Sequence, residues 1–346
     1  MRYLTILAAT LAAASPATGH HSDAGLDMDS LTTIEGVVTE FGWRNPHIYI
    51  TLDVAGESGE TVEWNIQTGS TITVGRMGWD RNSLAAGDRV TIQTNAARDG
   101  RPYGLLKTIV KDDGVRLPTA FDRGSDEPLI TVPEPEIGAT SLAGRWIADP
   151  AKLVSYPGGL DGLFRAHLEM TDAGLAAQNA LDELTDENPE STCVGRPTPG
   201  MIVATNLYPI EIEFFGDTIA KIRSEYFDDE RTVYMDGRGH PRADQRTVAG
   251  HSIGYRDGDV LVVDTANFSD HRSPYQMGVP SGAQKHVIER YRLLEGGKRM
   301  IVEFTLEDPE YIVGSMVHSR ELVYSPQMSM TRFDCNPDVT RRFVPE

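Results

Sequence analysis

Alternation of apolar and polar residues runs through most of the chain and predicts β-strands in both halves. In Tyr208–Phe215 the run IEIEFF alternates with the period of two that is typical of a half-buried strand. Asp-Gly, Gly-Asp and Gly-Gly pairs separate such runs and favour tight hairpin turns. The central hairpin is Gly250–Thr265, with its turn at Arg256–Asp259. The pattern therefore predicts a mainly β fold in which most neighbouring strands are antiparallel.

The first third of the chain is expected to form a small barrel. Strands are predicted at 34–41, 47–54, 61–67, 88–96 and 103–111. A helix is predicted over Ser70–Gly78, with the Ser70 hydroxyl as its N-cap. Five strands with a helix between the third and the fourth match the order of an OB-type barrel. We therefore expect an OB-like β domain over residues 20–115.

Residues 143–346 are expected to form a larger β domain. Strands are predicted at 208–215, 218–226, 231–235, 250–257, 260–265, 285–294, 300–306 and 316–324, with a further strand opening at 142–146. A short helical insertion is predicted at 160–167 and 171–184. The preferred interpretation is a lipocalin-like antiparallel β-barrel that holds one small ligand, and a β-sandwich is the alternative. The stretch 116–142, rich in Pro, Asp, Glu and Ser, is predicted to link the two domains.

Charge and hydropathy limit the partners and the location. The 346 residues carry a formal net charge of −19, which argues against nucleic acids and anionic lipid surfaces as partners. Arg2 followed by the apolar stretch Leu4–Ala14 predicts a signal peptide over residues 1–19, export to the periplasm and no membrane span in the mature chain. Cleavage after Gly19 would leave His20 as the first residue; cleavage after Ala14 or Ala17 is the alternative. The oligomeric state stays open.

The chain has two cysteines, Cys193 and Cys335. In an oxidising compartment such a pair predicts one disulfide, which would close a loop of roughly 140 residues. Two separate thiols are the alternative. The spacing does not match a zinc finger, so a structural zinc site is not expected.

Both halves resemble exported bacterial proteins of unknown function. The first resemblance rests on the start His20-His21-Ser22 and on the stretches EGVVTEFGWRNPHIYI, EWNIQTGS and GRMGW. The second rests on RTVYMDGRGHP, GHSIGYRDGDVLVVDT and LEDPEYI. The resemblance implies a fusion of two uncharacterised families and brings no activity with it.

Histidines near the predicted cleavage site suggest copper. A free amino-terminal His20 would offer its amine and ring nitrogen, and His47 a second imidazole, which is a donor set that suits copper. His21 is a rival ligand, and Met28 a soft one. The alternative is that these residues belong to a tail and a loop without metal.

Titratable residues on the predicted strands of the second domain suggest acid–base chemistry. Asp264 or Glu289 is the expected base, and His251 or His271 the expected acid. Arg231 or Arg238 would hold an anionic group, while Tyr234 and Tyr255 would orient a hydroxyl or carbonyl. The alternative is that most of these residues face solvent and form cross-strand ion pairs.

Three functions follow from these patterns. The first is binding of a small, partly apolar molecule in the larger barrel, together with hydratase-, isomerase- or lyase-type chemistry. The second is copper binding in the periplasm through His20, His21 and His47. The third is a carrier of small ligands without catalysis. The sequence does not decide whether the protein is an enzyme.

Overall fold

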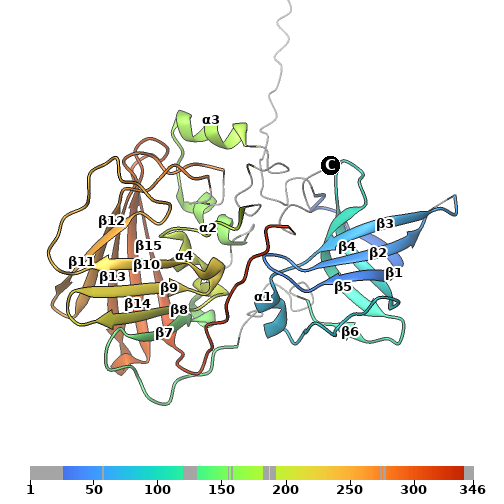
Figure 1. Ribbon diagram of the computed structural model, residues 1–346, viewed down its shortest axis with the longest axis horizontal. Helices are drawn as coiled ribbons and strands as arrows, with labels where there is room; N and C mark the ends of the chain where they lie inside the picture. The colour runs from blue at the N-terminus through green and yellow to red at the C-terminus, as the bar shows by residue number, and fades with distance from the viewer. Residues whose placement is uncertain are drawn as a thin grey trace, which may run out of the picture.

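Two closed β-barrels make up most of the computed structural model, and they lie side by side (Figure 1). The structure describes residues 26–56, 58–119, 131–154, 156, 159–181, 187, 192–272, 275 and 278–338. The mainly β fold expected from the alternation is therefore confirmed, and a sandwich is not formed. The predicted signal peptide, with His20 and His21, lies outside the described residues. The domain boundaries stay a prediction.

The smaller barrel has the expected OB-like order. Its elements are β1 (Thr32–Gly42), β2 (Tyr49–Ala55), β3 (Thr61–Gln67), α1 (Thr71–Arg76), β4 (Arg89–Ala96), β5 (Tyr103–Lys111) and β6 (Arg116–Leu117). The order β3-β2-β1-β4-β5 closes through a parallel pairing of β3 with β5. Ser70 caps α1 as predicted, because its hydroxyl accepts a hydrogen bond from the Thr73 amide at 3.1 Å.

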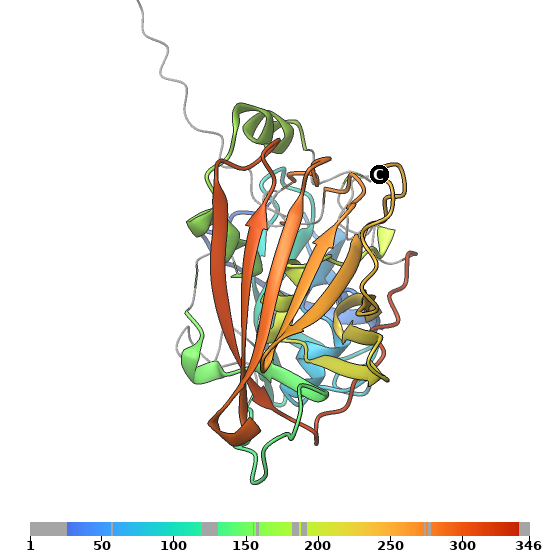
Figure 2. The same cartoon turned by 90° about the vertical axis from the view of Figure 1, so that its left-hand side faces the viewer.

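The larger barrel closes in the order β10-β11-β12-β13-β14-β15-β7-β8-β9. Its strands are β7 (Gly144–Ala148), β8 (Ile210–Phe215), β9 (Ile219–Ser224), β10 (Glu230–Tyr234), β11 (His251–Asp257), β12 (Val260–Ala266), β13 (His286–Leu294), β14 (Arg299–Glu307) and β15 (Ser315–Tyr324). One pair departs from the antiparallel expectation, because β10 and β11 are parallel. The connection 235–250 returns the chain to the end of the barrel where β10 began. Figure 2 shows the long strands β12–β15 face on.

Short helices complete the larger barrel. They are η1 (Pro150–Lys152), α2 (Gly159–His167), α3 (Asp172–Ala180), α4 (Gly200–Val203), η3 (Ala204–Asn206), η4 (Tyr226–Asp228) and η5 (Glu295–Gly297). Phe164 of α2 and Ile202 of α4 are fully buried in the same core as Trp146, Val263 and Phe304 of the strands. These two helices therefore fill part of the barrel interior. None of the helices in the described ranges is long and apolar enough to span a bilayer.

A third apolar cluster joins the two barrels. Ile72 of α1 packs with Tyr208, Tyr226 and Phe333, which belong to the second half of the chain. Arg76 extends the contact, since its guanidinium lies 2.6 Å from the buried carboxylate of Glu225. A joint made of buried apolar and charged contacts holds the barrels more firmly than a linker would.

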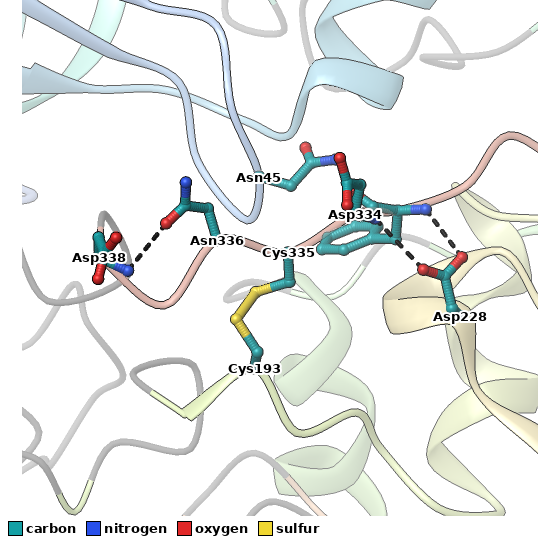
Figure 3. Close-up of a disulfide and its surroundings, with 8 residues drawn as sticks. Asn45, Cys193, Asp228, Asp334, Cys335, Asn336 and Asp338 are labelled. Carbon is teal, nitrogen blue, oxygen red and sulfur yellow. Dashed lines mark hydrogen bonds between the residues drawn. A yellow bond between two sulfur atoms is a disulfide. The ribbon is translucent and has the colours of Figure 1, made fainter.

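The carboxy-terminal segment is part of this joint (Figure 3). Asn45 of the smaller barrel accepts a hydrogen bond from the Thr71 amide at 2.8 Å and donates one to the Phe333 carbonyl. Two residues further on, Cys335 forms the predicted disulfide with Cys193, so the pairing of the two cysteines is confirmed. The disulfide ties the segment that crosses to the first barrel back to the second.

Candidate functional site

A buried ion pair occupies the interior of the larger barrel. The Arg231 guanidinium of β10 lies 2.5 Å from the Glu289 carboxylate of β13, and both side chains are almost fully buried. Tyr291 and Thr198 donate hydrogen bonds to Glu289 at 3.1 and 2.6 Å, and Arg231 donates one to Thr265 at 3.2 Å. Although burial disfavours its charge, the neighbouring Glu289 raises the pKa of Arg231. Each charge of the pair is therefore compensated inside the protein, as is typical of a structural core group, although Nε of Arg231 has no hydrogen-bond partner in the described structure.

A second buried cation adjoins this network. The Lys285 ammonium donates a hydrogen bond to the Thr198 carbonyl at 3.2 Å and lies 4.1 Å from the centre of the Phe268 ring. Burial lowers the pKa of Lys285 to about 7, against the attraction of Asp308. Asp308 accepts hydrogen bonds from the Tyr275 hydroxyl at 3.2 Å and the Gly282 amide at 2.8 Å. Lys285 and Asp308 thus each have hydrogen-bond partners within the protein.

Asp264 and His251 lie on the outer face of the barrel. In β12 the inward positions are Leu261, Val263 and Thr265, so strand alternation turns Asp264 outward. His286 and His240 both contact the same Asp264 oxygen, at 2.7 and 3.0 Å, and His240 lies 3.1 Å from His251. The two candidate bases therefore lie on opposite faces of the barrel wall, Asp264 outside and Glu289 inside.

In the outer cluster, made up of Asp264, His240, His251 and His286, neighbouring groups shift the pKa values of Asp264, His251 and His286. Although burial acts against it, hydrogen bonds from His286 and His240 lower the pKa of Asp264. The Asp264 carboxylate in turn raises the pKa of His286. Burial and the nearby His240 and Arg238 lower the pKa of His251. The cluster fastens the connection 235–250 onto the strands beneath it.

The remaining predicted site residues, Tyr234, Arg238, Tyr255 and His271, lie at different places on the larger barrel. Tyr234 stacks on His251 at 5.1 Å between ring centres, and Arg238 covers Tyr234 while it pairs with Asp236. Tyr255 is more than half exposed on the outer face. His271 is half-buried, and the Asp264 contacts do not include it. Arg231 and Glu289 are therefore the predicted site residues whose side chains lie in the barrel interior.

Metal binding finds no support in the described part of the chain. Within it, no group of three or more His, Cys, Asp or Glu side chains is arranged to hold an ion. His47 lies within 3.2 Å of the Thr68 carbonyl through Nδ1. Copper binding by His20, His21 and His47 stays a prediction, because the first two lie outside the described residues.

An opening in the barrel wall creates a pocket. On its β7 side, β15 pairs only through Leu322–Tyr324, and the Asp149 amide bonds to the Glu321 carbonyl at 2.9 Å. Beyond that point, Ser315–Arg320 has no strand partner on this side among the described residues, and a pocket of about 250 Å³ lies there. Its lining is Asp149, Lys152, Leu153, Val154, Tyr156, His318, Ser319, Arg320 and Glu321.

Two basic side chains of this pocket belong to the inward phase of β15. His318 and Arg320 alternate with outward residues and share a face with the buried Met316 and Leu322. Arg320 is 8% exposed, yet its Nε has no hydrogen-bond partner in the described structure, and neither has Nε2 of His318. Burial and the nearby Arg320 lower the pKa of His318 to about 4, so its ring is neutral at pH 7. This pocket is the candidate site.

Sequence reasoning missed the pocket, although a signal was present. In Met316–Tyr324 every second residue from Met316 onward shares one face of the strand. Met316, Leu322 and Tyr324 on this face are apolar, whereas His318 and Arg320 are polar. Polar residues in the inward phase of a strand indicate either a buried network or a ligand. From the sequence alone, His318 gives one of the weakest signals among the histidines, because a lone histidine in a strand carries little information.

Comparisons with known proteins add a family for the amino-terminal part. Residues 9–107 match a family of unknown function, DUF6152, which agrees with the expected uncharacterised amino-terminal family. The match ends before the larger barrel begins. No curated protein matches the chain. Among solved structures it is similar to a variant of the fluorescent protein UnaG, with 11% identity and a TM-score of 0.25 over 53% of this chain and 95% of the other.

The interior ion pair gives the first prediction. Glu289→Ala should lower the free energy of unfolding by about 3–5 kcal/mol, because it leaves the Arg231 charge buried without a partner. The double variant Arg231→Met/Glu289→Met should recover most of that loss, since it removes both charges. Urea unfolding of the two variants and the wild type measures this. Equal stability of Glu289→Ala and the wild type would contradict the structural role.

The outer cluster gives a prediction on pH. The raised pKa of His286 contributes stability that is complete below its unfolded value of about 6.5 and is lost as the pH rises through the folded value. The lowered pKa of Asp264 contributes stability that is lost as the pH falls through its folded value, below about 3.9. Asp264→Asn should therefore destabilise the protein most between about pH 4 and 6.5.

The same variant has a spectroscopic readout. In an NMR titration the pKa of His286 should fall in Asp264→Asn, because the carboxylate that favours the imidazolium is gone. Asp259→Asn, in an exposed turn, is the matched control and should leave the titration unchanged. Identical His286 titrations in all three proteins would refute the proposed coupling.

Proposed function

We propose that this protein binds a small molecule in its larger barrel, at the pocket beside β15. The observation that carries the proposal is the gap in the barrel wall at Ser315–Arg320, where inward-facing side chains border a pocket. Ligand sites are concave, mostly apolar and equipped with a few polar groups that set orientation. Leu153 and Tyr156 supply apolar surface here, and His318 supplies a polar ring atom without a protein partner.

The size of the pocket limits the ligand. Its volume of about 250 Å³ lies below the roughly 300–1,000 Å³ of pockets that hold drug-sized molecules. Tyr156 and His318 contribute aromatic rings to the lining. A short molecule fits this volume, and the largely polar lining, with Leu153, Val154 and Tyr156 as its apolar part, favours one that carries a polar group.

Binding, rather than catalysis, is what the arrangement favours. Of the two candidate bases, Glu289 lies in the interior and Asp264 on the outer face. Glu289 is also paired with Arg231, and its Oε1 accepts hydrogen bonds from Arg231, Tyr291 and Thr198. The disulfide Cys193–Cys335 supports an exported location for this binding protein, because such bonds persist in oxidising compartments.

A pocket-filling variant tests the proposal. Native mass spectrometry of protein purified from an exporting host should show an added mass that is released on denaturation. Leu153→Trp should abolish that added mass, because the indole would occupy the pocket. Val317→Trp, an equally large change on the outer face of β15, should retain it. An added mass that persists in Leu153→Trp, or none in the wild type, would refute the proposal.

A further inference from the structure

We infer that the ligand of the β15 pocket is a small carboxylate whose charged group pairs with the buried guanidinium of Arg320. The inference rests on the proposed function and names its ligand class. It starts from Arg320 itself, a side chain more than nine-tenths buried that borders the pocket.

Among the described residues, Arg320 has no acidic partner of the kind that a buried arginine usually has. No ion pair or side-chain hydrogen bond links it to an acid among the described residues, and its Nε has no acceptor there. Burial lowers the pKa of Arg320 to about 10, so it is still charged at pH 7. Burying a charge without a counter-charge costs several kcal/mol in general. A ligand anion would remove that cost.

The acids at the pocket are already engaged by a different arginine. Asp149 and Glu321 lie 3.1 and 3.6 Å from the Nε of Arg299, which also pairs with Glu134. Glu321 belongs to the outward phase of β15, whereas Arg320 belongs to the inward phase. Neither acid forms an ion pair with Arg320, so its guanidinium has no direct counter-charge among the described residues.

The geometry favours a carboxylate over a larger or more highly charged anion. A guanidinium offers two parallel N–H donors that match the two oxygens of a carboxylate. The Nε2 atom of neutral His318 is a further polar atom on the same inward face. Asp149 and Glu321 also line the pocket, and they repel a dianion such as a phosphate monoester more than a monoanion. The chain's net charge of −19 adds to that repulsion.

Matched probes separate the charge from the apolar body of the ligand. Calorimetry at pH 7 compares butanoate, hexanoate and octanoate with the corresponding primary amides, on protein freed of co-purified ligand by denaturation and refolding. At least one carboxylate should bind, and its amide should bind at least about tenfold more weakly, because it lacks the charge that pairs with Arg320.

Variants of Arg320 test its role directly. Arg320→Met should weaken carboxylate binding by about 10- to 100-fold, as expected for a lost charge-assisted hydrogen bond. Arg320→Lys keeps the charge but loses the planar fork, so it should fall between Met and the wild type. Arg290→Met, on the exposed outer face of β13, is the control and should bind as the wild type does.

Stability distinguishes a binding role from a structural one. Without ligand, Arg320→Met should unfold at the same temperature as the wild type or higher, because it removes an unpaired buried charge. A marked loss of stability in Arg320→Met would show that an acid of the protein pairs with Arg320, and it would overturn the inference.

Failure of the carboxylate can be told from failure of the pocket. Equal binding of amides and carboxylates, both lost in Leu153→Trp, would refute the carboxylate and leave the proposed function intact. Carboxylate binding that persists in Leu153→Trp and in Arg320→Met would refute both. Absence of binding for every carboxylate would also overturn the inference, while the added mass in the mass spectrum still tests the pocket.

Discussion

A charge taken out of water needs a counter-charge, and this requirement governs the larger barrel. Two arginines face its interior, and they meet the requirement differently. Arg231 has Glu289 at 2.5 Å together with the hydroxyl of Tyr291, so the protein itself supplies the counter-charge. Arg320 lies beside a pocket, and no acid of the described chain reaches it. The first arrangement stabilises a fold, whereas the second leaves an interaction for a molecule from outside.

The way in which the larger barrel closes explains why Arg320 lies beside a pocket. β7 is short and pairs with β15 only at Leu322–Tyr324. Among the described residues no strand pairs with Ser315–Arg320 on this side, and the segment that follows β7 lies there instead. That segment, with η1 and Tyr156, covers the gap without filling it. Elsewhere helices α2 and α4 and the aromatic core occupy the interior. The site is therefore an opening in the wall of a well-packed barrel. The first barrel is fastened to the second by Ile72, Arg76 and the disulfide-linked terminal segment, and does not border this opening.

Much of the fold could be predicted from local pattern, and much of the site could not. Alternation and turn residues predicted the strands of both barrels, because strands depend on neighbours in sequence. The helix capped by Ser70 was predictable for the same reason, and the disulfide because the chain has two cysteines. Alternation does not say which phase faces inward when both phases carry polar residues. Asp264 follows a run of apolar residues and was expected in a site, yet the adjacent Thr265 points inward. The parallel pairing of β10 with β11 depends on the path of a long connection, which has no local signature. Arg231 and Glu289 meet across 58 residues of chain, a contact that pattern cannot foresee.

The most direct test is a crystal structure of the exported protein with bound hexanoate. The account predicts that the carboxylate oxygens lie about 2.7–2.9 Å from the guanidinium nitrogens of Arg320, with the hydrocarbon chain against the rings of Tyr156 and His318. An aspartate or glutamate of the chain paired with Arg320, or hexanoate bound away from β15, would contradict it.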